Sequence, residues 1–377
     1  MSRESIITIN GQEFKFEPGE TILDVATRNG IHIPTLCYLK RASSPTGACR
    51  MCVVEVEGAR NLVASCSTPA APGMVVRTDT KRVIEARRLN LELLLSSGNH
   101  NCLVQDLNQD NWTDFQLDSL KIKEHENICP AYGRCRLQDL AIQYGVKPRF
   151  IPKKTKYPVE ENSFFIRDFS RCILCGRCVQ ACNEIQVNNA ISFGYRGADT
   201  KVVAKGDYPL TNSDCVFCGE CVQVCPVGSL VPRSVIINKV LPNEVKKIRT
   251  TCSYCGVGCQ LYLHVKDNKI VEVTGVEDVP PNYGSLCVKG RFGYEFVHHP
   301  ERLKKPLIKE NGKFREAEWD EALELVANRL KEIKEKYGPD SMGFLTSARA
   351  TNEENYIAQK FTRAVLGTNN IDHCARL

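Results

Sequence analysis

The chain has 377 residues, of which 42% are hydrophobic and 25% are charged, a composition typical of globular proteins with about two to four domains of this total length. The formal net charge of +6 is a mild excess spread over the sequence, which argues against a nucleic-acid-binding protein because such proteins concentrate basic residues on one face. No apolar run of about 18 residues occurs, so we expect no membrane span. The first ten residues carry neither a secretory signal pattern nor a twin arginine.

Twenty residues are cysteine, and nineteen of them fall into five groups between Cys37 and Cys287. Disulfide-rich proteins are usually small secreted domains, whereas this chain is long and its cysteines are spaced as metal ligands. Thiols stay available to soft metal centres in a reducing compartment. We therefore expect a cytoplasmic protein whose cysteines hold metal clusters and whose lysines and arginines offset the negative charge of those clusters.

Residues 1–80 begin with a predicted hairpin over 5–16, turning at Asn10-Gly11, and a helix that starts near Thr21 and stops at Gly30. Four cysteines follow with the spacing C-x11-C-x2-C-x13-C: Cys37, Cys49, Cys52 and Cys66. With the stretch GETILDVATRNGIHIPTLCY, this pattern resembles the β-grasp, plant-type [2Fe-2S] ferredoxin domain of complex I large subunits and their relatives. The resemblance implies one [2Fe-2S] cluster on these cysteines. A structural zinc site is the alternative, although zinc cysteines usually come as two C-x2-C pairs.

Within residues 81–150, the stretch Ser97-Gly98-Asn99-His100 and the stretch from Cys129 through Cys135 to Leu140 resemble the next module of the same families, in which one histidine and three cysteines hold a [4Fe-4S] cluster. The resemblance implies His100, Cys102, Cys129 and Cys135 as ligands, with residues 105–126 as a surface insertion between them. His125 is an alternative to His100, because it stands four residues before Cys129, at the spacing that the family uses.

Residues 160–240 contain an internal repeat of C-x2-C-x2-C-x3-C, which is the most specific motif in the sequence. The repeated cysteines are Cys172, Cys175, Cys178 and Cys182, then Cys215, Cys218, Cys221 and Cys225. The repeat resembles two-cluster bacterial ferredoxins, in which the fourth cysteine of each motif ligates the other cluster. Cys225 is therefore predicted to complete the first [4Fe-4S] site and Cys182 the second. Zinc is a poor alternative, because four thiolates within eleven residues crowd one tetrahedral ion.

Residues 245–305 carry a fourth pattern, C-x2-C-x3-C-x27-C, formed by Cys252, Cys255, Cys259 and Cys287. With Gly290-Arg291-Phe292 and the stretch 300–308, it resembles the N-terminal [4Fe-4S] domain of the molybdopterin oxidoreductases. In that family a lysine after the fourth cysteine helps to relay electrons between the cluster and the pterin. Lys289 occupies this place, and a solvated surface lysine is the alternative reading.

Residues 306–377 read as the start of an α/β domain of the same family. Apolar residues from Trp319 to Tyr337 predict an amphipathic helix closed by Gly338, followed by a strand over 341–346 and a helix over 352–366. The stretch 368–377 resembles the formate dehydrogenase segment that leads into the metal-ligating selenocysteine or cysteine. One hypothesis is that a selenocysteine codon was read as a stop or that the gene was divided there; a naturally short electron-transfer subunit is the alternative. In the first case Cys374 is structural and the chain alone is expected to be inactive toward formate.

The order of the modules resembles the alpha subunit of cytoplasmic, NAD-linked or hydrogenase-linked formate dehydrogenases. The resemblance implies an α+β multidomain protein with one [2Fe-2S] and four [4Fe-4S] clusters, and a Mo- or W-bis(pyranopterin guanine dinucleotide) in the full-length protein. Electrons would pass from that site through the clusters, with the histidine-ligated and [2Fe-2S] centres last, to a flavin-bearing or hydrogenase partner. The alternative function is a non-catalytic iron-sulfur subunit of a hydrogenase or NADH-oxidising complex. A complex I large subunit ranks third, because it normally lacks two complete C-x2-C-x2-C-x3-C motifs.

Overall fold

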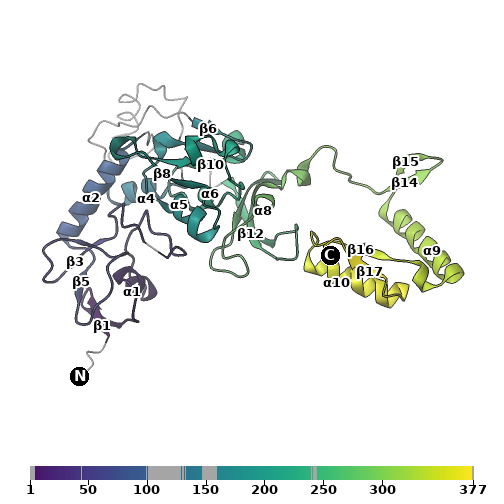
Figure 1. Ribbon diagram of the computed structural model, residues 1–377, viewed down its shortest axis with the longest axis horizontal. Helices are drawn as coiled ribbons and strands as arrows, with labels where there is room; N and C mark the ends of the chain where they lie inside the picture. Colours follow the sequence, from purple (N-terminus) through teal and green to yellow (C-terminus); the bar gives the residue numbers. More distant parts are fainter. Residues whose placement is uncertain are drawn as a thin grey trace. The chain divides into compact units, whose positions relative to one another are not determined.

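The computed structural model describes residues 5–43, 45–98, 100, 129, 131, 133–146, 159–238, 240 and 244–375 (Figure 1). Contacts along the chain divide it into two compact units, Met1–Val245 and Lys246–Leu377, and each is described by itself. Within the described ranges, every helix is too short or too polar to cross a bilayer.

The first unit begins with a five-stranded sheet and one helix, here called the β-grasp module. The strand order is β2-β1-β5-β3-β4, and the elements are β1 (Ile6–Ile9), β2 (Gln12–Lys15), α1 (Ile22–Arg28), β3 (Val53–Val56), β4 (Val63–Ala64) and β5 (Val75–Arg77). Asn10 and Gly11 both have positive φ, which allows the tight turn of the predicted β1–β2 hairpin. Thr21 and Asp24 form a capping box at the start of α1. The buried faces of α1 and the sheet share one apolar core that includes Ile7, Val25 and Val76.

Two helices of the next segment pack on each other and connect to the β-grasp sheet. They are α2 (Lys81–Leu95) and α4 (Arg136–Gln143). Arg87 on α2 is buried, and its guanidinium donates to the carbonyl of Val53 at 2.9 Å and to the hydroxyl of Tyr144 at 3.2 Å. This buried arginine thus joins strand β3 to the end of helix α4.

The third part of the first unit, here called the cysteine-repeat module, spans residues 159–238. It contains a three-stranded sheet of order β10-β7-β6, the β8–β9 hairpin and three short helices. The elements are β6 (Val159–Glu161), β7 (Phe165–Asp168), α5 (Arg177–Gln180), β8 (Ile191–Gly194), β9 (Lys201–Ala204), α6 (Glu220–Val224), β10 (Leu230–Pro232) and α7 (Arg233–Ile237). Helix α5 continues as one π-helical turn over Ala181–Ile185.

The backbone of this module repeats along with its sequence. Leu174 and Phe217, which precede equivalent cysteines, have φ of 53° and 52°, and Gly176 and Gly219, which follow those cysteines, have φ of 80° and 71°. Two left-handed residues around one cysteine bend each loop so that the next residues start a helix, α5 in one copy and α6 in the other. The repeat that the sequence predicts is therefore present in the conformation of the chain.

The second unit contains a three-stranded antiparallel sheet and the beginning of an α/β arrangement. Its elements are β11 (Lys246–Thr251), β12 (Gln260–Lys266), β13 (Lys269–Gly275), α8 (Val288–Phe292), β14 (Leu307–Glu310), β15 (Lys313–Glu316), α9 (Trp319–Tyr337), β16 (Phe344–Thr346), α10 (Asn352–Phe361) and β17 (Ile371–His373). Strands β16 and β17 pair in parallel, and the antiparallel sheet has the order β11-β12-β13.

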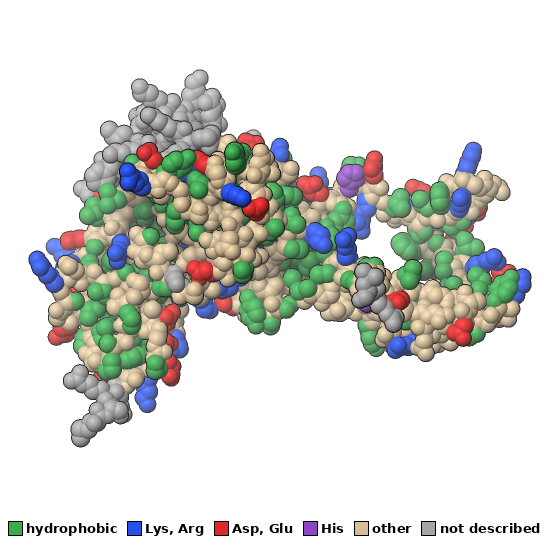
Figure 2. Space-filling view, in the orientation of Figure 1, with side chains coloured by type: hydrophobic (Ala, Val, Ile, Leu, Met, Phe, Trp, Pro, Cys, Tyr) green, Lys and Arg blue, Asp and Glu red, His purple; other side chains and the backbone are tan. Residues whose placement is uncertain are grey.

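The predicted helix from Trp319 to Tyr337 is confirmed as α9, and Gly338 follows it. The strand predicted over 341–346 is shorter, since it begins at Phe344, whereas α10 and its π-helical extension through Leu366 match the second predicted helix. No residue of α9 is buried. The apolar side chains of this helix are therefore on the surface of the unit, and Figure 2 shows hydrophobic groups exposed in this part of the chain.

Candidate functional site

The four cysteines of the β-grasp module converge in one buried loop region. Cys37, Cys49, Cys52 and Cys66 are all buried. The sulfurs of Cys52 and Cys66 lie 3.3 Å apart, and the backbone N–H of Cys49 donates to the sulfur of Cys37 at 3.5 Å. Gly47 has a φ of 59°, which lets the loop before Cys49 turn back toward these sulfurs. The four soft donors are the set that a [2Fe-2S] cluster requires.

Hydrogen bonds within this group divide the thiols into two pairs. A hydrogen bond from Cys49 lowers the pKa of Cys37 to about 5, and one from Cys66 lowers the pKa of Cys52 to about 7. The same contacts raise the pKa of Cys49 and of Cys66, because each must lose a proton beside a thiolate. Two of the four thiols are thus poised to ionise near neutral pH, the state in which a thiol ligates metal.

The predicted histidine-ligated site is only partly within the described residues. His100, Cys129 and Cys135 are buried, and Cys135 is the residue before helix α4. Burial raises the pKa of Cys135 to about 12, and charge repulsion from Cys129 adds to the rise. Cys102, His125 and the predicted insertion at 105–126 lie outside the described residues. The choice between His100 and His125 therefore stays a prediction.

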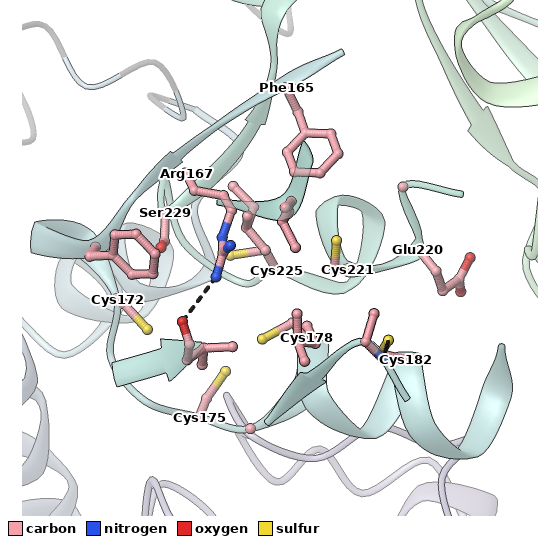
Figure 3. A pocket seen from close by; sticks show the side chains of 18 of the residues that line it. Phe165, Arg167, Cys172, Cys175, Cys178, Cys182, Glu220, Cys221, Cys225 and Ser229 are labelled. Carbon is pink, nitrogen blue, oxygen red and sulfur yellow. Dashed lines mark hydrogen bonds between the residues drawn. The ribbon is translucent and has the colours of Figure 1, made fainter. Parts of the chain in front are cut away.

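All eight cysteines of the repeat line one cavity, which Figure 3 shows from close by. Apolar side chains supply most of the remaining wall, including Phe165, Ile191 and Leu230. About 880 Å³ of space, in part open to solvent, lies between the lining atoms. A cavity this apolar and this rich in thiols suits a cofactor held by sulfur rather than a polar small molecule.

The grouping of sulfurs around the cavity has the crossed pattern of the predicted ligand sets. Burial raises the pKa of Cys175, and repulsion from Cys225 and then from Cys172 adds to it. Burial likewise raises the pKa of Cys215, with repulsion from Cys182. The fourth cysteine of each motif therefore lies near the first cysteines of the other motif, as the prediction requires; the ligation itself remains a prediction.

Equivalent backbone amides point at equivalent sulfurs in the two copies of the repeat. The N–H of Leu174 donates to Cys172 at 3.4 Å, and the N–H of Phe217 donates to Cys215 at the same distance. A third amide, that of Ala190, donates to Cys182 at 3.3 Å. Such hydrogen bonds stabilise the charged form of a sulfur and help to set the potential of a cluster bound to it.

Single-metal sites are absent from the part of the chain that the structure describes. No group of three or more histidine, cysteine, aspartate or glutamate side chains there is arranged to hold one metal ion. A zinc ion draws its ligands into one tight tetrahedron, whereas a four-iron cluster holds its thiolates around a larger body. The preference for iron-sulfur clusters over zinc therefore rests on the spacing of the cysteines.

The cysteines of the second unit lie where the antiparallel sheet meets helix α8. Cys252 follows β11, Cys259 precedes β12 and Cys287 precedes α8. The N–H of Cys252 donates to the carbonyl of Cys259 at 2.8 Å. Burial raises the pKa of both thiols, and repulsion from Cys255 and Cys287 adds to each. The structure therefore brings the four predicted ligands together.

Lys289 is exposed and lies on helix α8, two residues after Cys287. Its positive charge lowers the pKa of the Cys252 thiol, although burial outweighs this effect. The predicted relay residue is thus close enough to the thiol group to act on it electrostatically. Nearby, the amide of Asn352 at the start of α10 donates to the carbonyl of Gly256 at 2.7 Å, so the cysteine loop also contacts the α/β segment.

Several residues around the cavity of the cysteine-repeat module were not singled out from the sequence. Arg167, Arg177 and Glu220 are buried charged residues that line the cavity or belong to its cysteine loops. Arg177 and Glu220 occupy the same place in the two copies, directly after the left-handed glycine and before the third cysteine. The sequence did contain a signal for Arg177 and Glu220, because they carry opposite charges at equivalent positions of the repeat.

Comparisons with known proteins agree with this modular description. Residues 2–81 match the family model for a 2Fe-2S iron-sulfur cluster binding domain, and residues 171–229 match that for a 4Fe-4S dicluster domain. Residues 245–299 match the molybdopterin oxidoreductase Fe4S4 domain, and residues 302–377 match the molybdopterin oxidoreductase family. The chain thus carries ferredoxin-type domains followed by the start of a molybdopterin oxidoreductase domain.

Two curated relatives from Staphylococcus aureus, strains bovine RF122 / ET3-1 and MSSA476, are named as candidate formate dehydrogenases. Each is 34% identical over 413 aligned residues that include 100% of this chain. The chain spans 39% of the length of either relative. Among solved structures, an NAD+-reducing [NiFe]-hydrogenase in the H2-reduced state is 29% identical with a TM-score of 0.50, over 62% of this chain and 88% of the hydrogenase chain.

Proposed function

We propose that this chain, which corresponds to the N-terminal part of a formate dehydrogenase-type alpha subunit, carries electrons between a molybdenum- or tungsten-pterin site and a partner protein. The observation that carries the proposal is the convergence of both cysteine motifs on one apolar cavity. Iron-sulfur clusters supply one-electron carriage when bound. Because the chain covers only part of its relatives, formate as the substrate belongs to the proposal.

The ligands of the five proposed clusters are nineteen cysteines and one histidine of the chain. A [2Fe-2S] cluster would be held by the buried cysteines of the β-grasp module, and a second centre by His100, Cys102, Cys129 and Cys135. The cysteine-repeat module would hold two [4Fe-4S] clusters, one on Cys172, Cys175, Cys178 and Cys225 and one on Cys215, Cys218, Cys221 and Cys182. The last would be held by Cys252, Cys255, Cys259 and Cys287, with Lys289 between it and the pterin.

The protein contributes burial, fixed ligands and local charge. Eight of the described ligand cysteines are buried, and the amides of Leu174, Phe217 and Ala190 favour negative charge on the sulfurs that they contact. Arg167 lowers the pKa of Cys221, against the larger effect of burial, and so offsets part of the negative charge of the site. Because these ligands need reduced thiols, we place the protein in the cytoplasm.

The partner is proposed to be a flavin-bearing, NAD-linked subunit or a hydrogenase subunit. The support is the likeness to the hydrogenase chain, 88% of which aligns with this protein. The same observation favours the second candidate function, a non-catalytic electron-transfer subunit in such a complex. The molybdopterin oxidoreductase match over 302–377 favours the first candidate, since an electron-transfer subunit needs no pterin domain.

Anaerobic reconstitution with iron and sulfide, followed by iron analysis and electron paramagnetic resonance (EPR), tests the proposal. Replacing Cys225 with serine should abolish the same [4Fe-4S] signal as replacing Cys175, whereas Cys182→Ser should abolish the signal that Cys218→Ser removes. Cys374→Ser, outside all five groups, is the matched control and should leave every signal intact. A protein that binds zinc and no iron would refute the electron-transfer function. In the full-length enzyme, formate should reduce the clusters; a failure there would favour the second candidate.

A further inference from the structure

One loop of the β-grasp module lies directly on the cysteine-repeat module. This docking loop consists of residues 38–43 and 45–46, and it falls between the proposed cluster ligands Cys37 and Cys49. The carbonyl of Tyr38 accepts a hydrogen bond from Arg177 at 3.0 Å. The backbone N–H and the hydroxyl of Ser43 donate to the carboxylate of Glu184 at 2.7 and 2.8 Å. Several independent contacts therefore fix the loop on its neighbour.

The partners of this loop belong to the cysteine loops of the other module. Arg177 precedes Cys178, and the hydroxyl of Thr46 lies 3.5 Å from the carbonyl of Cys175. The side chain of Thr46 also faces Gly176, where an added Cβ would be 3.4 Å from its methyl group. Arg177 is next to the proposed ligand Cys178, and Tyr38 is next to the proposed ligand Cys37. One hydrogen bond therefore connects the neighbours of two ligands that belong to different proposed clusters.

An ion pair between Arg41 and Glu220 crosses the same contact. Glu220 is fully buried, and the side chain of Arg41 is 20% exposed. Removing one partner of such a pair is costly because it leaves a buried charge uncompensated. Leu39 of the docking loop packs against Ala181 and Val224 of the cysteine-repeat module, so apolar contacts accompany the ion pair.

The ion pair also distinguishes the two copies of the repeat. The loop uses Arg177 of the first copy as a donor and Glu220 of the second copy as an acceptor, and these residues occupy equivalent positions. A loop turned by the pseudo-twofold of the repeat would place Arg41 against Arg177, with like charges together. The pair therefore selects one of two related orientations of the loop.

We propose that Arg41 and Glu220 are positioning residues that hold the docking loop against the first copy's cysteine loop, so that an electron passes directly between these two cluster sites. The step rests on the proposed function. With both clusters bound, one electron would pass from the reduced [4Fe-4S] centre that Cys172, Cys175, Cys178 and Cys225 would hold to the oxidised [2Fe-2S] centre. No bond is made or broken, and no proton moves.

The test compares Arg41→Gln, Arg41→Lys and the control Arg28→Gln in the reconstituted full chain. Arg28 pairs with Glu20 at 2.8 Å in the same module, away from the docking loop. Iron content is measured first, then the relaxation of the [2Fe-2S] EPR signal by the neighbouring reduced cluster, and finally the rate at which an electron from flash photoreduction reaches the [2Fe-2S] centre.

Removing the positive charge that Arg41 places beside the buried carboxylate of Glu220 should shift the docking equilibrium by roughly a hundredfold. Arg41→Gln should therefore keep its iron, lose the enhanced relaxation and transfer the electron at least about tenfold more slowly. Arg41→Lys keeps the positive charge, so it should retain most of the enhanced relaxation and most of the electron-transfer rate. Arg28→Gln should behave as the wild type. In the double variant Arg41→Gln with Glu220→Gln the negative charge is removed together with the positive one, so part of the loss should be recovered.

Unchanged relaxation and rate in Arg41→Gln would overturn the positioning role, and so would loss of iron from the cysteine-repeat module, which would mean that the pair serves folding. A wild-type chain that forms no [2Fe-2S] or [4Fe-4S] cluster would instead refute the proposed function. The two failures are therefore distinguishable by the iron content of the wild-type protein.

Discussion

Replacing Gly228 with alanine should selectively disturb the proposed cluster site that contains Cys129. An added Cβ would lie 2.9 Å from the sulfur of Cys129, 3.1 Å from the Cβ of Ala131 and 3.5 Å from the Cδ of Arg171. Favourable contacts between such atoms need about 3.5 to 4.0 Å, so something must move by roughly half an ångström or more. The backbone at 228 does not have a left-handed φ, so the cost comes from these contacts alone.

The cysteine is the neighbour expected to yield. Arg171 is buried and its guanidinium is hydrogen-bonded to Asp168 at 2.8 Å. On the other side, the hydroxyl of Ser229 donates to the carbonyl of Asp168, and its own carbonyl accepts from the N–H of Asp168, both at 2.8 Å. Overpacking of this kind costs about 1 to 3 kcal/mol. If that cost falls on the ligand, cluster affinity drops by about tenfold to a hundredfold.

Iron and sulfide analysis with EPR measures the outcome. Gly228→Ala should lose about four iron atoms per chain, those of one [4Fe-4S] cluster, while the other signals remain. Gly343→Ala is the matched control, because an added Cβ there meets nothing closer than 3.6 Å. If Gly228→Ala keeps its full iron content and an unshifted spectrum, Cys129 does not hold a cluster in the position that it has beside Gly228.

Three further outcomes are expected. Removing iron should increase amide hydrogen exchange far more in the cysteine-repeat module than in the β-grasp module. The cysteine-repeat module has a thiol-lined cavity at its centre, whereas the β-grasp module has an apolar core. An equal loss of protection in the two modules would contradict this. Lys289→Met should lower the midpoint potential of the adjacent proposed cluster, because a positive charge that favours reduction is lost. The decrease should not exceed about 60 mV, because the lysine is exposed. A redox titration that shows no shift, or a shift to higher potential, would contradict this. A hydrogen bond from Ser347 lowers the pKa of Cys374, so Ser347→Ala should slow alkylation of Cys374 at pH 7, where the thiolate is scarcer without that bond, and should have no effect above about pH 10, where both thiols are ionised; equal rates at pH 7 would refute this.

The modules could be predicted from the sequence because their signals are local. Metal-ligand spacing is set by the cluster, so each cysteine group predicts its loop without knowledge of the rest of the fold. The hairpin around Asn10 and helix α9 from Trp319 to Tyr337 were also predicted correctly, since a turn pair and a regular apolar period lie within a few residues. The shorter strand β16 shows the usual uncertainty of element ends.

Contacts between modules could not be predicted, because they join residues that are distant in sequence. Arg41 and Glu220 are 179 positions apart, and no sequence motif contains both residues. The close approach of Gly228 to Cys129 likewise follows from how two loops pack, not from either loop's composition. The histidine-ligated group was harder to predict, because Cys129 lies far along the sequence from the earlier ligand candidates His100 and Cys102.

The repeat explains why those contacts fall where they do. Within each copy, a bound cluster would fix the cysteines and the left-handed glycine, and the two copies have similar φ angles there. The residue between that glycine and the third cysteine ligates nothing, so it is free to differ, and it is Arg177 in one copy and Glu220 in the other. Each of these residues faces the docking loop of the β-grasp module. A symmetric metal-binding frame can therefore present an asymmetric surface, and it is at this variable position that a neighbouring module is recognised.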